Sequence, residues 1–147
     1  MKFKDFFNED MTPNWKKILS VKEFSSLKCV KYKDGSVFDH TKSTVEHMAK
    51  ELDMLSVSNT DDTYLVMMMG ALCHDIGKKT EHIDGESGIN GSNICRRLFY
   101  DEKVFNRERV CYMVKSLPYM WTMFDNDMAI RTLIRISWGH ASVKDME

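Results

Sequence analysis

A wholly apolar stretch, from Leu65 to Cys73, restricts the folds open to this chain more than any other feature of the sequence. The stretch includes three consecutive methionines and has no polar side, which is typical of a helix buried all round in the middle of a domain. It is far too short to span a bilayer, for which about 20 apolar residues are needed. The sequence therefore predicts a central helix from Asp61 to His74 and no membrane partner.

The other periodic segments are also helical, and together they predict an all-α bundle of about six helices. The expected helices of the main array span residues 39–55, 61–74, 88–99, 106–116 and 126–142. We expect Asn59 or Thr60 to cap the second of these helices and Pro118 to halt the fourth. The stretch 77–91 carries four glycines and predicts a loop over the mouth of a pocket.

Residues 1–35 mix aromatic side chains with lysines and predict a capping segment packed on the main body. Within this segment, Pro13 offers a start for a short helix over residues 14–19. Residues 36–147 form the main domain, and we expect the two parts to fold as one unit. A chain of 147 residues can bury a core without disulfides or a structural metal.

Charge and cysteine content narrow the class of protein further. The formal charge is −1, so the chain lacks the global field of a general nucleic-acid or membrane binder. The four cysteines are widely spaced, form no C-x-x-C pair and lie mostly among apolar residues, as free buried thiols do. With no signal peptide in the sequence, these features predict a protein of the reducing cytoplasm.

The strongest chemical signal follows the apolar helix directly. His74 and Asp75 lie in the segment Ala71–Lys78, which reads A-L-C-H-D-I-G-K. A neutral imidazole nitrogen and a carboxylate are standard ligands of a divalent transition metal. For an isolated pair, a hydrogen-bonded core histidine beside a capping aspartate is the alternative interpretation.

A second segment, Val37–Thr41, reads V-F-D-H-T and places His40 at the start of the first main helix. Together the two segments resemble the HD family of metal-dependent phosphohydrolases, which is defined by a first His, a later His-Asp doublet and a last Asp. The doublet segment is similar to the A-L-L-H-D-I-G-K form common in that family. The resemblance covers about Phe38 to Ala141 and is greatest to the HD domains associated with tRNA nucleotidyltransferases, in a stand-alone form.

The resemblance implies an HD-domain helical bundle that binds one or two divalent ions such as Mn, Fe, Ni or Mg. It implies a hydrolase that attacks a phosphate ester of a small phosphorylated substrate, either a nucleotide or the end of an oligonucleotide. By the same resemblance His40, His74 and Asp75 are metal ligands, and Asp75 is the catalytic group that orients or deprotonates the attacking water. Lys78 is the expected catalytic and substrate-binding cation, with a solvated loop lysine as the alternative. The oligomeric state does not follow from the sequence.

The sequence departs from the family pattern where the last metal-binding Asp is expected. Alignment places Gly139 or His140 there, so either His140 is a fourth metal ligand or the site has three protein ligands. Ser87 stands where many relatives have a histidine, which favours one ion over two. The alternative function is therefore a catalytically degenerate HD-fold module that binds a nucleotide or regulates a partner.

Two further histidines and four arginines are candidates for the surroundings of the site. His82, in the loop after the doublet, is a candidate for substrate binding, with an ordinary loop histidine as the alternative. His47 returns to nearly the same helix face as His40, and we expect it in the core or beside the metal ligands. Four arginines could form a basic rim for a phosphate or a solvated helical face: Arg96, Arg97, Arg107 and Arg109.

Overall fold

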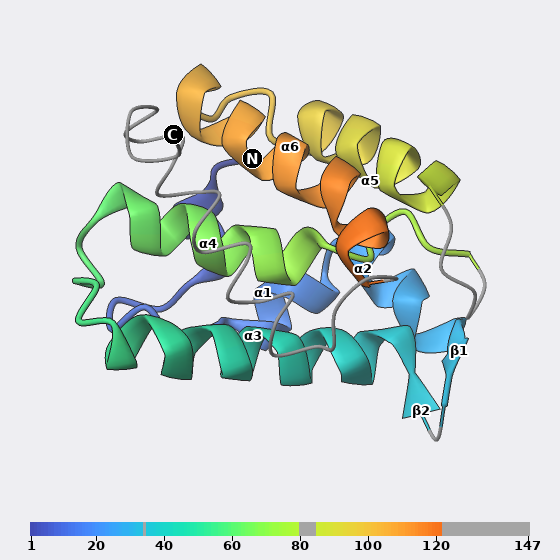
Figure 1. The fold of residues 1–147 in the computed structure, drawn as a ribbon, viewed down its shortest axis with the longest axis horizontal. Coiled ribbons are helices and arrows are strands. Elements are labelled where there is room, and N and C mark those ends of the chain that lie inside the picture. The colour runs from blue at the N-terminus through green and yellow to red at the C-terminus, as the bar shows by residue number, and fades with distance from the viewer. Residues whose placement is uncertain (34, 80–84, 122–147) are drawn as a thin grey trace.

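The computed structural model of the chain describes residues 1–33, 35–79 and 85–121 (Figure 1). These ranges contain six α-helices and one small two-stranded sheet, which confirms the predicted all-α fold. The long helices are α3 (Val37–Met54), α4 (Asp62–Cys73), α5 (Gly85–Leu98) and α6 (Val104–Trp121). The short elements are η1 (Phe3–Phe6), α1 (Trp15–Leu19), α2 (Lys22–Ser25), η2 (Ser26–Cys29), β1 (Lys31–Tyr32) and β2 (Gly35–Ser36).

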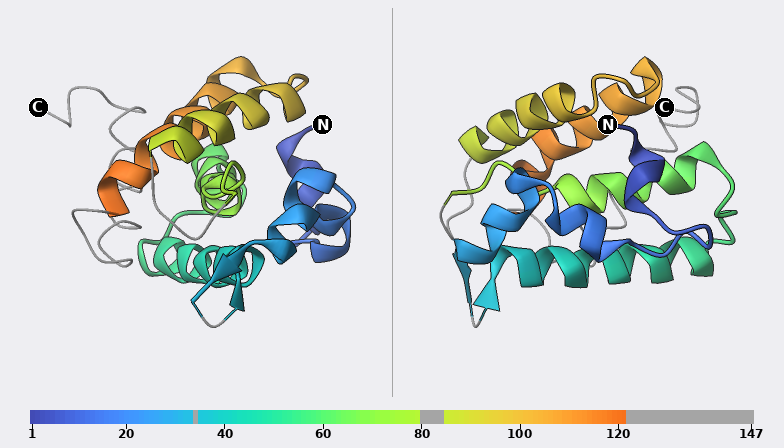
Figure 2. Two further views of the ribbon diagram at one scale, coloured as in Figure 1. Left: turned by 90° about the vertical axis from the view of Figure 1, so that its right-hand side faces the viewer. Right: turned by 180° about the vertical axis from the view of Figure 1, so that it is seen from behind.

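Helix α4 is the centre of the fold, as its apolar sequence predicts. Every residue from Tyr64 to Cys73 is buried. Figure 2 shows α4 end-on, with α3 on one side, α5 and α6 on another, and the N-terminal elements on a third. The N-cap of α4 is Asp61 rather than Asn59 or Thr60, because its carboxylate accepts the Thr63 N–H at 2.9 Å. No helix in the described part of the chain is long and apolar enough to cross a membrane.

A capping box determines where α3 begins. The Asp39 N–H donates to Ser36 Oγ at 3.1 Å, and the Ser36 N–H donates to Asp39 Oδ2 at 3.0 Å. Both amides would otherwise lack a partner at the start of the helix, so the pair stabilises a first turn that contains His40. Strands β1 and β2 pair antiparallel just before this turn, with Tyr32 opposite Gly35.

The N-terminal segment contributes to the main core. Phe3 and Phe6 are fully buried, and their ring centroids lie 4.9 and 5.6 Å from that of Phe99, just after α5. Edge-to-face contacts of this kind stabilise a core beyond the area they bury. The segment therefore packs on the main array, as a capping segment is expected to do.

The predicted loop over residues 77–91 is partly wrong, because α5 already begins at Gly85. A Cβ atom on Gly77 would lie 2.3 Å from the backbone nitrogen of Gly91 and 2.4 Å from the carbonyl oxygen of Ser87. Glycine is therefore needed here because the segment after α4 packs directly against the backbone of α5, and not because the loop is flexible.

The prediction that Pro118 halts the helix is also wrong, because α6 continues to Trp121. A proline removes one i→i−4 hydrogen bond and crowds the preceding turn, but packing of the surrounding turns can outweigh this cost. Helix α6 packs along α5 and α4. The helix expected over residues 126–142 lies outside the described residues.

Candidate metal centre

Three candidate ligands converge where the first turn of α3 meets the end of α4. Helices α3 and α4 run antiparallel (Figure 1), so the beginning of one lies beside the end of the other. His40 comes from α3, His74 caps α4 and Asp75 follows it. One donor atom from each residue lies within 4.8 Å of the other two. Residues far apart in the sequence thus form one cluster that could hold a metal ion.

The two imidazole rings face the same carboxylate, and a backbone hydrogen bond orients the ring of His74. His74 Nδ1 lies 2.7 Å from the carbonyl oxygen of Ala71, and a carbonyl only accepts, so Nδ1 carries the hydrogen. His74 Nε2 then faces Asp75 Oδ2 at 3.0 Å, while His40 Nε2 lies 3.7 Å from the same oxygen. The backbone bond therefore selects the ring nitrogen that faces the cluster, as is usual for metal-binding histidines.

Burial and neighbouring charges keep His40 neutral and Asp75 ionised, the protonation states in which both can bind a metal ion. Burial lowers the pKa of His40 to about 4, with His74 acting in the same direction and Asp75 opposing. Burial alone would raise the pKa of Asp75, but the charge of His74 and its hydrogen bond hold it at about 2. His40 is consequently neutral and Asp75 ionised at neutral pH. Burial disfavours a charged His74, yet Asp75 and the Ala71 carbonyl raise its pKa above the ordinary value.

The donor set fits a divalent transition metal. Two imidazole nitrogens and a carboxylate oxygen are the ligand types that such ions prefer. The ionised Asp75 gives this donor set a negative charge, which favours the binding of a positively charged ion. The side chains of His40 and Asp75 are 11% and 16% exposed, so within the described part of the chain the cluster is open to solvent.

Tyr32, which no motif in the sequence marks as functional, also lies against the cluster. Its ring centroid is 4.3 Å from that of His40, with 30° between the planes, and Lys78 Nζ lies 5.0 Å from the same centroid. Tyr32 thus contacts both a ligand and the expected phosphate cation. The sequence pointed to Tyr32 only through the turn that precedes α3, since this turn joins the two strands of the hairpin that carries Tyr32.

Tyr32→Ala is expected to lower manganese affinity by about tenfold, because side chains that orient metal ligands contribute about 10- to 100-fold. The contact is through the ring face, so Tyr32→Phe is expected to bind manganese as the wild type does. Titration of free manganese followed by electron paramagnetic resonance measures both affinities. Equal loss in the two variants would show that the hydroxyl group, and not the ring, supports the site.

In comparisons with known proteins, no family model matches this sequence, and no curated protein or solved structure matches the chain. The resemblance to the HD family accordingly remains a prediction from the D-H-T and H-D-I-G-K segments. The convergence of His40, His74 and Asp75 does not depend on that resemblance, because it is a property of the folded chain.

The other residues with a predicted role at the site are His47, Lys78 and two histidines outside the described residues. His82 and His140 lie outside the described residues, so their predicted roles stay predictions. His47 is exposed, and its expected place in the core or beside the ligands is wrong. Seven residues of an α-helix turn about 20° less than two full turns, so position 47 does not return fully to the face of position 40. Lys78 is only 6% exposed, so the solvated-loop alternative does not describe it.

The four arginines do not form a shared basic rim. Arg96 and Arg107 both bind Glu108, at 2.9 and 3.1 Å, whereas Arg109 is buried with its guanidinium over the Phe105 ring. Arg97 lies on another side of α5 and binds Glu23 at 3.3 Å. Exposed pairs of this kind contribute little to stability.

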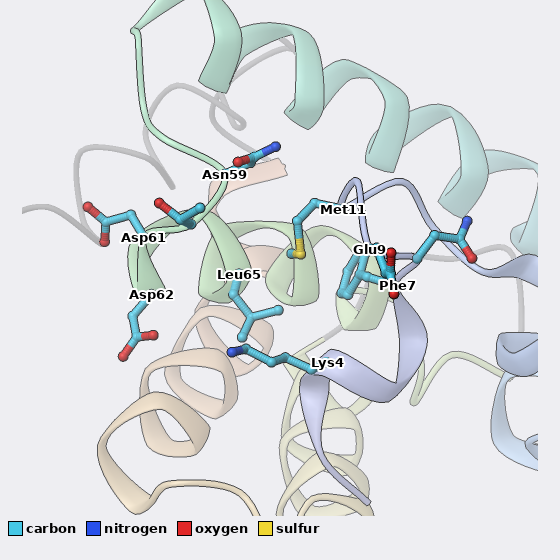
Figure 3. Close-up of a pocket in the computed structure, with 10 residues that line it drawn as sticks. Lys4, Phe7, Glu9, Met11, Asn59, Asp61, Asp62 and Leu65 are labelled. Carbon is cyan, nitrogen blue, oxygen red and sulfur yellow. The ribbon is translucent and has the colours of Figure 1, made fainter.

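A separate pocket of about 400 Å³ lies at the other end of α4, against η1. Figure 3 shows the Lys4 side chain extending past Leu65 toward the side on which Asp62 lies. Lys4 and hydrogen bonding from Asn106 both help to lower the pKa of Asp62, with Asn106 the larger cause. Asp62 is already bound by Asn106 and Lys103, which lie outside the pocket lining, and we assign this pocket no function.

Proposed function

We propose that the protein is an HD-type, metal-dependent phosphohydrolase or phosphodiesterase that acts on a phosphate ester of a nucleotide or a nucleic-acid end. The observation that carries the proposal is the approach of His40, His74 and Asp75 donor atoms to within 4.8 Å of one another. These are also the residues by which the two motifs resemble the family. The ion is proposed to be Mn, Fe, Ni or Mg, with a single ion favoured.

The bound ion would supply a nucleophilic water at neutral pH and offset charge on the phosphoryl oxygens. His40 and His74 would hold it as neutral ligands, with His74 kept in orientation by the Ala71 carbonyl. Asp75 is ionised and partly exposed, so it can orient a water molecule or accept its proton. Lys78 would attract the phosphate to the cluster as a point charge.

A second candidate function is a binding or regulatory module that has kept the ion but lost turnover. It is favoured by the ligand count, since the described residues provide three ligands and the expected carboxylate of the last helix is missing from the sequence. Tight nucleotide binding without hydrolysis would distinguish this function from the first.

The test is a screen of phosphomonoesters, phosphodiesters and nucleotides with manganese-loaded wild-type protein, measured in parallel with Asp75→Asn. We expect turnover of at least one class of ester, and a loss of about 100-fold or more in the variant, because Asn neither accepts the proton nor ligates as a carboxylate. If the manganese-loaded protein binds a nucleotide but hydrolyses no ester of the panel, the proposed hydrolase is wrong and the binding module is the better proposal.

A further inference from the structure

A second pocket, of about 390 Å³, lies between α2, α5 and the segment that follows Asp75. None of the three metal ligands lines it, so it is distinct from the metal centre. Among the described residues that line it, three carry a positive charge and one a negative charge: Lys78, Lys79, Arg97 and Glu23. The pocket therefore has an excess of positive charge.

Lys78 is the most unusual of these cations. Lys78 is only 6% exposed, its Nζ lies 5.0 Å from the centroid of the Tyr32 ring, and its charge helps to lower the pKa of Asp75. It forms no ion pair with any carboxylate in the described part of the chain. Asp75 compensates this charge only from beyond ion-pair distance, so an anion bound in the pocket would offset part of the cost of burying the ammonium group.

The other two cations are available to a ligand. Lys79 is exposed and forms no ion pair within residues 1–33, 35–79 and 85–121. Arg97 makes one 3.3 Å contact with Glu23, and its side chain is 68% exposed. A single contact at that exposure contributes little, so a phosphate could take one edge of the guanidinium in a bidentate pair.

Two carboxamides lie beside these charges on α5. Asn90 and Asn93 are one turn apart, and Arg97 is one turn further, so the three share a face of the helix. Neither amide side chain hydrogen-bonds to another described residue. Each amide offers a donor and an acceptor in one plane, which suits the polar groups of a nucleotide.

We propose that this pocket binds a phosphate group of the substrate other than the one that is hydrolysed. The inference rests on the proposed function, and Lys78 connects the two sites because it lines the pocket and also lies over Tyr32, which stacks on His40. The preferred substrate is accordingly a nucleotide or oligonucleotide with a second phosphate. The pocket would hold this phosphate with Lys79 and Arg97.

The first experiment titrates inorganic pyrophosphate calorimetrically into protein freed of metal by a chelator and then dialysed. Arg97→Gln is expected to bind about tenfold more weakly, which corresponds to one charge-assisted hydrogen bond. The matched control is Arg96→Gln, the next residue on α5, which binds Glu108 and does not line the pocket. It is expected to stay within about twofold of the wild type, because exposed charges are screened.

If the wild type does not bind pyrophosphate, or if the two variants bind it with the same affinity, the proposed phosphate-binding role of the pocket is wrong. Because this titration contains no metal, its result is separate from that of the proposed hydrolase activity. The second experiment compares the manganese-loaded variants on p-nitrophenyl phosphate and on a 5′-phosphorylated dinucleotide. Arg97→Gln is expected to raise KM for the dinucleotide alone, with kcat unchanged; an equal effect on both substrates would overturn the assignment to a second phosphate.

Discussion

The His74→Ala variant is expected to carry almost no metal after purification without chelator or a nickel column, whereas the wild type carries about one equivalent of a transition metal. A backbone hydrogen bond to the Ala71 carbonyl, at 2.7 Å, holds the orientation of His74. Its loss also leaves Asp75 without the partner that keeps its pKa near 2. Affinity should fall by more than the roughly 100-fold seen when outer contacts are removed. Elemental analysis of both proteins measures the difference.

The matched control for this experiment is His47→Ala, which removes an exposed histidine from α3 and should leave the metal content unchanged. His74 is buried, so circular dichroism is recorded to confirm folding, and His40→Ala provides a second variant at a partly exposed ligand. Added manganese should raise the melting temperature of the wild type and His47→Ala only. If the wild type holds no metal and manganese does not stabilise it, the cluster is not a metal centre and the binding module becomes the better proposal.

The Gly77→Ala variant is expected to lose on the order of 3 kcal/mol of unfolding free energy, which is at the upper end for overpacked sites. The added Cβ would meet the Gly91 nitrogen at 2.3 Å and the Ser87 carbonyl oxygen at 2.4 Å. Both are backbone atoms of α5, so relief requires a movement of the whole segment after α4. This segment also carries Lys78. Urea denaturation followed by circular dichroism measures the loss, which corresponds to a fall of about 10 °C in Tm.

Gly70→Ala is the control for this effect, because it makes the same substitution in the buried helix α4. Its Cβ would meet the far end of the Met113 side chain, at 2.6 Å from Cε. A methionine side chain can move, and alanine favours a helix over glycine by about 1 kcal/mol, so the stability should stay within about 1 kcal/mol of the wild type. Equal stability of the two variants would contradict the close packing of residues 77 and 91.

The sequence alone predicted the elements whose causes are local. Hydrophobic patterns act within a few residues, so the periodic segment of α3 and the uniformly apolar segment of α4 were predicted to within two residues of their observed ends. The uniform apolar character of Leu65–Cys73 likewise determined that α4 is central. Glycine and proline signals were less informative. Helix α5 already begins at Gly85 and α6 continues through Pro118, because packing against neighbouring helices outweighs a local preference.

The helical class, the central helix and the chemical types of the candidate ligands could be predicted from residue order alone. The tertiary structure decided which of these residues meet. Only the antiparallel packing of α3 on α4 brings His40 to 3.7 Å from Asp75, and only the hairpin brings the Tyr32 ring onto His40. The burial of Lys78 and its place beside Arg97 also depend on contacts between distant segments. No pattern of neighbouring residues encodes such contacts, because they arise when the helices pack together.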